Sequence, residues 1–196
     1  MKEKLGLVHI YTGRGKGKTS ASLGLSLRAA GYNLKVYIIQ FLKGGDTGEL
    51  FAIEKYIPNI TIAQFGKDAL SEKQTNIHEF GKPTEKKGNN GRFRFRPDNE
   101  EQEPSRRALE HAFNIVHHNQ YDVLVLDEVN YALSKGLISV QDVLRLVEKK
   151  GENLELIFTG RNAPIELINV ADYVTDMHEV KHPFQQNISA REGIDY

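Results

Sequence analysis

Runs of apolar and β-branched residues alternate with segments of helical periodicity along most of this chain. The runs predict strands at residues 5–11, 34–41, 60–65, 121–128, 154–159 and 173–180. Apolar residues at helical spacing predict helices at residues 20–30, 49–56, 105–119, 140–150 and 163–170. Strands that alternate with helices in this way indicate an α/β fold, with one mostly parallel sheet covered by helices on both faces.

Local signals refine three of these helices. The first helix is expected to bury Leu27 together with the apolar residues that share its side at helical spacing. Ser139, followed three residues later by Asp142, matches a weak capping box and predicts the start of the fourth helix. Asn162 is expected to cap the last helix, which has a proline in its first turn.

A long polar segment over residues 66–104 interrupts the pattern, while nothing else in residues 1–196 suggests a linker or a second domain. Within this loop, residues 91–97 alternate arginine and phenylalanine, which places Phe93 and Phe95 on one side. Three interpretations stay open on the pattern alone. They are a β-ribbon with a solvated basic face, a surface for stacking nucleic-acid bases, and a platform for a large flat ligand.

Composition narrows the class of protein. The 26 basic and 26 acidic residues cancel, which argues against broad electrostatic binding to nucleic acid or to a membrane surface. The chain has no cysteine, so disulfides, iron–sulfur clusters and thiolate metal sites are excluded. The N-terminal residues carry no apolar signal core and no stretch has the length of a membrane span, so a soluble, cytoplasmic protein is expected.

Residues 12–20, Thr-Gly-Arg-Gly-Lys-Gly-Lys-Thr-Ser, join the first predicted strand to the first predicted helix. Glycines at this junction let backbone N–H groups converge on a phosphate, and the helix N-terminus adds a partial positive charge. Lys18 is expected to reach phosphate oxygens and the Thr19 hydroxyl to ligate Mg²⁺. Thr12 stands where the usual phosphate-binding loop has its first glycine, so the glycine frame is one residue shorter and starts at Gly13.

Acidic and basic residues follow two other strands. Asp127 and Glu128 end an apolar strand, which is where a phosphate-binding protein places the carboxylate that holds Mg²⁺. Arg161 follows the end of the strand at residues 154–159. From pattern alone, a contact to a nucleotide and a surface salt bridge are equally good interpretations of this arginine.

Three histidines lie in or near the helix predicted over residues 105–119. They are His111, His117 and His118. Adjacent side chains on a helix point in different directions, and no carboxylate stands at ligand spacing. Surface histidines are therefore favoured over a metal site.

These motifs predict a nucleoside triphosphate and magnesium, but not the reaction. Hydrolysis, phosphoryl transfer and attack at another atom of ATP all stay open. The alternatives are a P-loop NTPase or small-molecule kinase and an ATP-dependent nucleic-acid-binding protein that uses the Arg-Phe repeat. The neutral net charge weighs against nucleic-acid binding.

Several segments, in the same order and nearly end to end, resemble the ATP:corrinoid adenosyltransferases of cobalamin biosynthesis and salvage. They are the loop at 12–20, Val-Tyr-Ile-Ile-Gln-Phe-Leu-Lys-Gly (36–44), Leu-Asp-Glu-Val-Asn-Tyr (126–131), Thr-Gly-Arg-Asn-Ala-Pro (159–164), Val-Lys-His-Pro-Phe (180–184) and Gly-Ile-Asp-Tyr (193–196). The resemblance implies a P-loop NTPase-like fold of the RecA type that holds ATP in reversed orientation. It also implies transfer of the 5′-deoxyadenosyl group of ATP to cobalt(I) of a corrinoid, with release of triphosphate.

The resemblance also implies roles for individual residues. Thr19 and Glu128 would ligate Mg²⁺, with Asp127 behind them, and Arg161 would contact the nucleotide or its phosphates. The residues expected to cradle the triphosphate are Gly13, Arg14, Gly15, Lys16, Gly17, Lys18 and Thr19. Lys18 and Arg161 would act by positioning and electrostatics, because cobalt(I) is itself the nucleophile.

Two departures from the family pattern stand out. Members often carry an N-terminal helical extension that caps the site, whereas only residues 1–4 precede the first predicted strand. The segment over 66–104 is longer than in other members, and Phe93 and Phe95 have the spacing of two aromatic residues that lie beneath the corrin ring and displace its lower axial ligand. The resemblance further implies a homodimer and an external electron donor, such as a reduced flavoprotein.

Overall fold

The computed structural model describes residues 4–66 and 99–195. These residues form one six-stranded sheet in the order β3-β2-β4-β5-β1-β6, and every strand pair in it is parallel. The strands are β1 (Val8–Thr12), β2 (Val36–Phe41), β3 (Ile60–Phe65), β4 (Val123–Asp127), β5 (Glu155–Thr159) and β6 (Tyr173–Asp176). The predicted α/β fold is therefore confirmed, and it is consistent with a P-loop NTPase-like architecture.

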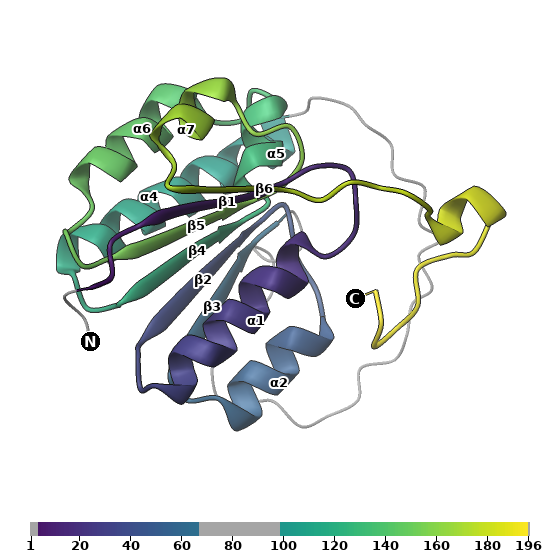
Figure 1. Ribbon diagram of the computed structural model, residues 1–196, viewed down its shortest axis with the longest axis horizontal. Helices are drawn as coiled ribbons and strands as arrows, with labels where there is room; N and C mark the ends of the chain where they lie inside the picture. The colour runs from purple at the N-terminus through teal and green to yellow at the C-terminus, as the bar shows by residue number, and fades with distance from the viewer. Residues whose placement is uncertain (1–3, 67–98, 196) are drawn as a thin grey trace.

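Helices cover both faces of this sheet (Figure 1). One face carries α1 (Lys18–Gly31) and α2 (Gly48–Tyr56). The opposite face carries α4 (Asn99–His118), α5 (Val129–Ser134), α6 (Val140–Lys149) and α7 (Ile165–Val170). Each face has its own apolar core, and both cores draw on the buried strands β2, β4 and β5. Strands buried on both faces need continuous apolar runs, which is the pattern that the sequence shows.

The side that the first helix buries agrees only in part with the prediction. Leu27 is 55% exposed, whereas Ser22, Ser26 and Ala29 face the sheet. The two buried serine hydroxyls donate to carbonyls of the preceding turn, Thr19 O and Ser22 O, both at 2.8 Å, so they are not left unpaired. Leu23 and Ala30, which share the predicted side with Leu27, pack partly buried against the core, and the small buried side chains let α1 lie close to the sheet.

Two helix starts also differ from the predictions. Helix α4 begins at Asn99 rather than at residue 105, and Pro104 lies inside it. A proline near a helix start removes only one hydrogen bond, and Glu100 and Glu101 in the first turn favour the positive end of the helix. Asn162 does not cap α7, because it adopts a left-handed conformation with φ 57° and Pro164 is the N-cap residue.

Ser139 is confirmed as the N-cap of α6, with Asp142 at the N3 position. The Ser139 Oγ accepts a hydrogen bond from the Asp142 backbone N–H at 3.1 Å and donates to the Asp142 carboxylate at 2.6 Å. The last strand, β6, ends at Asp176 rather than at residue 180. Beyond it the chain includes a short 3₁₀ turn, η2 (Pro183–Gln186), and continues to residue 195. Within residues 4–66 and 99–195, no helix has both the length and the apolar composition that a membrane crossing needs.

Candidate functional site

The loop between β1 and α1, residues 13–17, lies at the carboxyl edge of the sheet and is called the phosphate loop below. Gly13 and Gly17 have φ values of 96° and 115°, which residues other than glycine rarely adopt. Gly15 donates its N–H to the Met177 carbonyl at 2.6 Å, and a Cβ added at Gly15 would lie 2.6 Å from that oxygen. The glycines thus allow both the loop conformation and the close approach of the segment that follows β6.

Lys18, the first residue of α1, is only 8% exposed. Its ammonium donates to the carbonyls of Gly13 at 2.9 Å and Gly15 at 2.8 Å, so the side chain folds back over the phosphate loop. Burial lowers the pKa of Lys18, and the negative charge of Glu128 acts in the opposite direction. A phosphate oxygen is a stronger acceptor than a carbonyl, so an anion in the loop would compete for this ammonium.

The carboxylate of Asp127, the last residue of β4, is fully buried and fully hydrogen-bonded. One oxygen, Oδ1, accepts from the hydroxyls of Thr19 at 2.9 Å and Thr159 at 2.6 Å. The other oxygen, Oδ2, accepts from the Gln40 amide at 3.1 Å and the Lys43 ammonium at 2.8 Å. With four donors, Asp127 acts as the hub of a polar network that reaches the start of α1 and the ends of β2 and β5.

Glu128 makes the turn between β4 and α5 in a left-handed conformation, with φ 64°. Its backbone N–H donates to the Thr159 hydroxyl at 2.9 Å, which holds the turn in place. Burial and the neighbouring Asp127 charge raise the pKa of the Glu128 carboxyl, whereas the charges of Lys43, Lys18 and Arg161 lower it. A strained non-glycine residue that carries a partly buried carboxylate is typical of a functional site.

Arg161 is exposed just after β5. Its charge influences the pKa of both Lys18 and Glu128, so the guanidinium lies within electrostatic reach of the phosphate loop and the acidic turn. The preceding Gly160 has φ 125°, and a Cβ there would lie 2.8 Å from the Tyr131 backbone nitrogen. Only glycine lets this strand end pass α5 so closely and deliver Arg161 to the site.

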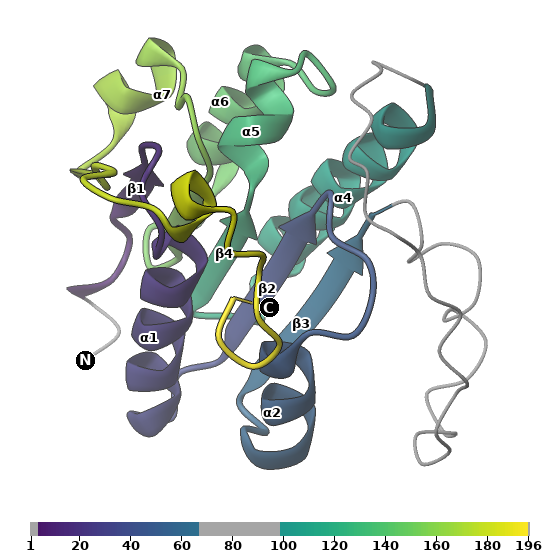
Figure 2. The same ribbon diagram turned by 90° about the vertical axis from the view of Figure 1, so that its right-hand side faces the viewer.

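The segment after β6 crosses the carboxyl edge of the sheet, which faces the viewer in Figure 2. There the exposed Lys16 ammonium pairs with Asp195 and also donates to the Ile194 carbonyl at 3.3 Å. The pKa of the Asp195 carboxyl is lowered, chiefly by its hydrogen bond to Lys16. The side chain of Arg14, in the same loop as Lys16, is also exposed. These two basic side chains of the phosphate loop therefore face outward, unlike Lys18.

The structure brings most of the predicted site residues to one edge. Five of them come from three chain segments and interact there through hydrogen bonds or through charge effects on each other's pKa values. They are Lys18, Thr19, Asp127, Glu128 and Arg161. Phe93 and Phe95, predicted to meet a corrinoid, lie outside the described residues.

The oxygen atoms at this edge are suited to Mg²⁺. Thr19 provides a hydroxyl, and Asp127 and Glu128 provide carboxylates, the hard oxygen donors that this ion prefers. Both oxygens of Asp127 already accept hydrogen bonds, from four protein donors in all. Glu128 is therefore the carboxylate with more capacity to ligate a metal ion. The Lys43 ammonium between the Asp127 and Thr19 oxygens shows that a cation fits at this position.

Three network residues were not identified from the sequence: Gln40, Lys43 and Thr159. Gln40 and Thr159 are fully buried near the carboxyl ends of β2 and β5, and Lys43 follows β2 by two residues. A polar side chain at the carboxyl end of an otherwise apolar strand was the available signal, because ligands of parallel α/β sheets bind at that edge.

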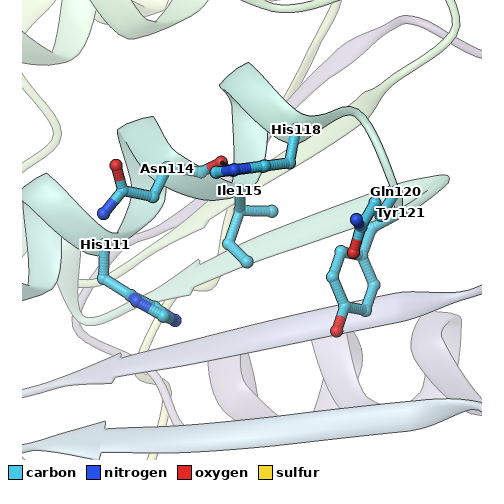
Figure 3. A pocket seen from close by; sticks show the side chains of 6 residues that line it. All are labelled: His111, Asn114, Ile115, His118, Gln120 and Tyr121. Carbon is cyan, nitrogen blue, oxygen red and sulfur yellow. Dashed lines mark hydrogen bonds between the residues drawn. The ribbon is translucent and has the colours of Figure 1, made fainter.

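A separate pocket lies on the α4 face and is lined by residues from α4 and from the connection between α4 and β4 (Figure 3). The lining residues are His111, Asn114, Ile115, His118, Gln120 and Tyr121. His117 and His118 are exposed, as predicted, but His111 is half-buried and shares a hydrogen bond of 2.8 Å with the Tyr37 hydroxyl. Burial lowers the pKa of His111 and raises that of Tyr37 to about 12. His111 therefore belongs to the core packing of this face, contrary to the predicted surface position.

Comparisons with known proteins give a consistent result. Residues 4–196 match the model of a family described as ATP:corrinoid adenosyltransferase BtuR/CobO/CobP. A corrinoid adenosyltransferase of Sinorhizobium sp is 31% identical over 199 residues, which cover 99% of this chain and 82% of that protein. Proteins of the same description from Escherichia coli (strain K12) and Salmonella typhimurium, the latter named CobA, are 26% and 25% identical over 197 residues, covering 99% of this chain and 87% of each relative.

Proposed function

This chain belongs to the ATP:corrinoid adenosyltransferase family, and from that membership we propose that it transfers the 5′-deoxyadenosyl group of ATP to cobalt(I) of a corrinoid. Inorganic triphosphate is the second product. The observation that carries this proposal is the phosphate loop with its buried Lys18, set beside the Asp127–Glu128 turn in a chain that the family model matches almost end to end. The reaction belongs to cobalamin biosynthesis or salvage.

The chemistry requires no protein nucleophile. Cobalt(I) donates an electron pair to C5′ of ATP, the C5′–O bond breaks, and its electron pair leaves with the triphosphate. No proton is transferred in this step. The protein therefore has two tasks, which are to hold C5′ in line with the cobalt and to stabilise the charge that develops on the leaving triphosphate.

We assign these tasks to the residues at the carboxyl edge. The backbone of residues 13–19 and the Lys18 side chain would surround the triphosphate, and Arg161 would approach it from the end of β5. Arg14 and Lys16 face outward in the structure, and Lys16 would leave Asp195 to reach the phosphates. Thr19 and Glu128 would hold Mg²⁺, and Asp127 would orient Thr19 through the hydrogen bond of 2.9 Å. When bound, Mg²⁺ supplies positive charge next to the oxygens that become negative as the bond breaks.

The corrinoid and the electron supply rest on the family resemblance. We propose that Phe93 and Phe95 lie beneath the corrin ring and displace the lower axial ligand, which makes reduction to cobalt(I) easier. The chain has no cysteine, so a thiol-based reductant of its own is excluded and a reduced flavoprotein is the proposed donor. We further propose a homodimer that works in the cytoplasm.

An anaerobic assay tests the proposed function. The protein is mixed with ATP, Mg²⁺ and chemically reduced cob(I)alamin, the visible spectrum is followed, and the phosphate products are separated. The expected result is a light-sensitive cobalt–carbon product with one triphosphate per product. Release of orthophosphate without a cobalt–carbon product would instead identify a P-loop NTPase and refute the transferase.

A further inference from the structure

The ammonium of Lys43 lies beside Thr19, a proposed Mg²⁺ ligand, and beside the buried carboxylate of Asp127. It is 2.8 Å from Asp127 Oδ2, 3.3 Å from Thr19 Oγ1 and 4.0 Å from Glu49 Oε1. The Lys43 side chain is 27% exposed and the Asp127 side chain 1% exposed. The Lys43 ammonium is thus a cation surrounded by three oxygen-bearing side chains, as a bound metal ion would be. One of these side chains is the predicted metal ligand Thr19.

The backbone around Lys43 is built to hold it there. The preceding residue, Leu42, has φ 59°, an unfavourable conformation for a large side chain, and its N–H is fixed by the Phe65 carbonyl at 3.1 Å. Gly66 packs so closely that a Cβ there would lie 2.7 Å from the Gly44 backbone nitrogen. Strain that is held in place by neighbouring contacts is typical of functional positions.

Charge explains why a cation is needed at this position. A fully buried carboxylate is strongly destabilising unless a positive charge compensates it, and Lys43 is the charged donor to Asp127. A divalent ion bound between Thr19 and Glu128 would compensate Asp127 as well. It would also repel an ammonium a few ångströms away, so Lys43 and the metal exclude each other.

We propose that Lys43 is a tethered cation that fills the metal position in the empty protein and is released toward the triphosphate when Mg·ATP binds. This inference rests on the proposed metal site. Lys43 is thus a positioning residue with two states. In the empty protein it preserves the alignment of Asp127 and Thr19, and in the loaded protein it adds positive charge beside the leaving group.

Binding of Mn²⁺ without nucleotide, measured by electron paramagnetic resonance, tests the first state. If the Lys43 ammonium occupies the site about nine-tenths of the time, wild type has an apparent Kd for Mn²⁺ about tenfold larger than a protein without that ammonium. Lys43→Met is therefore expected to bind Mn²⁺ about tenfold more tightly than wild type. Lys55→Met, at an exposed lysine of α2, is the matched control and should equal wild type.

The outcomes separate this inference from the proposed function. Equal or weaker Mn²⁺ binding by Lys43→Met would overturn the tethered cation and leave the metal site intact. Absence of Mn²⁺ binding in every protein, even with ATP, would overturn the metal site itself. A lysine that was merely a structural ion pair would lower stability on removal without tightening the binding of a metal.

A measurement on wild type covers the case in which Lys43→Met does not fold. The ¹⁵N-ammonium signal of Lys43, assigned by its loss in Lys43→Arg, should be visible in the empty protein because two hydrogen bonds slow its proton exchange. Saturating Mg·ATP should shift or broaden this signal. An unchanged signal at saturation would show that the ammonium stays in place, and would overturn the proposal.

Discussion

Replacing Thr159 by valine removes one hydroxyl on which both acidic residues of the site depend. The side chain is fully buried at the end of β5. Its hydroxyl donates to Asp127 Oδ1 at 2.6 Å and accepts the Glu128 backbone N–H at 2.9 Å. Valine has nearly the same shape, so the substitution leaves no cavity and isolates the loss of these two hydrogen bonds.

The expected cost follows from the two bonds. A hydrogen bond to a charged group contributes about 1.5–3 kcal/mol, and an unpaired N–H in a buried turn costs about 1–3 kcal/mol. Because the two effects share one hydroxyl, and because Glu128 is only partly buried, we expect a combined loss of about 3 kcal/mol in the free energy of unfolding. For a chain of this size, that lowers Tm by about 6–12 °C.

Thr159→Ser is the matched control, because it keeps the hydroxyl and loses one methyl group. It should cost about 1 kcal/mol. Thermal and urea unfolding of the three proteins measure the difference, and the Mg²⁺ concentration for half-maximal triphosphate release reports on the site. We expect that concentration to rise in the valine variant and to stay near wild type in the serine variant. A valine variant as stable as the serine variant would refute the role assigned to this hydroxyl.

Three further predictions concern the phosphate loop and the acidic turn. Lys18→Ala should reduce triphosphate release by about a thousandfold or more with an unchanged far-ultraviolet circular dichroism spectrum, and full activity would refute the phosphate contact. Glu128→Gln should raise the Mg²⁺ requirement for triphosphate release. Because the folded-state pKa of Glu128 is raised, its carboxylate destabilises the empty protein once the pH exceeds the unfolded value of about 4.5, so the glutamine variant should gain stability in urea at pH 8 but not at pH 4. Gly15→Ala should abolish ATP binding in calorimetry, because its methyl group would lie 2.6 Å from the Met177 carbonyl, and normal binding would show that the loop tolerates the side chain.

The sequence predicted the sheet well because parallel strands buried on both faces carry apolar runs that are easy to recognise. It placed the start of α4 too late for a related reason. The first turns of that helix, from Glu100 to Glu103, are polar and largely solvent-facing, so they show no apolar periodicity. The side that α1 buries was predicted only in part, because a close approach to the sheet selects small residues and the spacing of leucines does not indicate this.

Some residues of the site were identifiable from the sequence and others were not, for a similar reason. Lys18, Thr19 and Asp127 stand in short local motifs, and the sequence identified all three as candidates. Gln40 and Thr159 enter the network only through the register of the sheet. Gln40 pairs with Asp127 across β2 and β4, and Gln64 donates to Gln40 from β3 at 3.0 Å. A register between distant segments has no local pattern, so these roles required the structure.

The place of β1 in the sheet has a consequence for synthesis of the protein. β1 lies between β5 and β6, where Val8 pairs with Leu156 and Thr12 pairs with Asp176. The ribosome therefore synthesises β1 long before it synthesises β5 or β6. Pairing between strands that are so far apart in sequence is slow to form. Until then β1 is an unpaired strand, and unpaired strands make incomplete chains prone to aggregation. The contact of Gly15 with the Met177 carbonyl can form only after β6 has been made, so the conformation of the loop depends on the completed sheet.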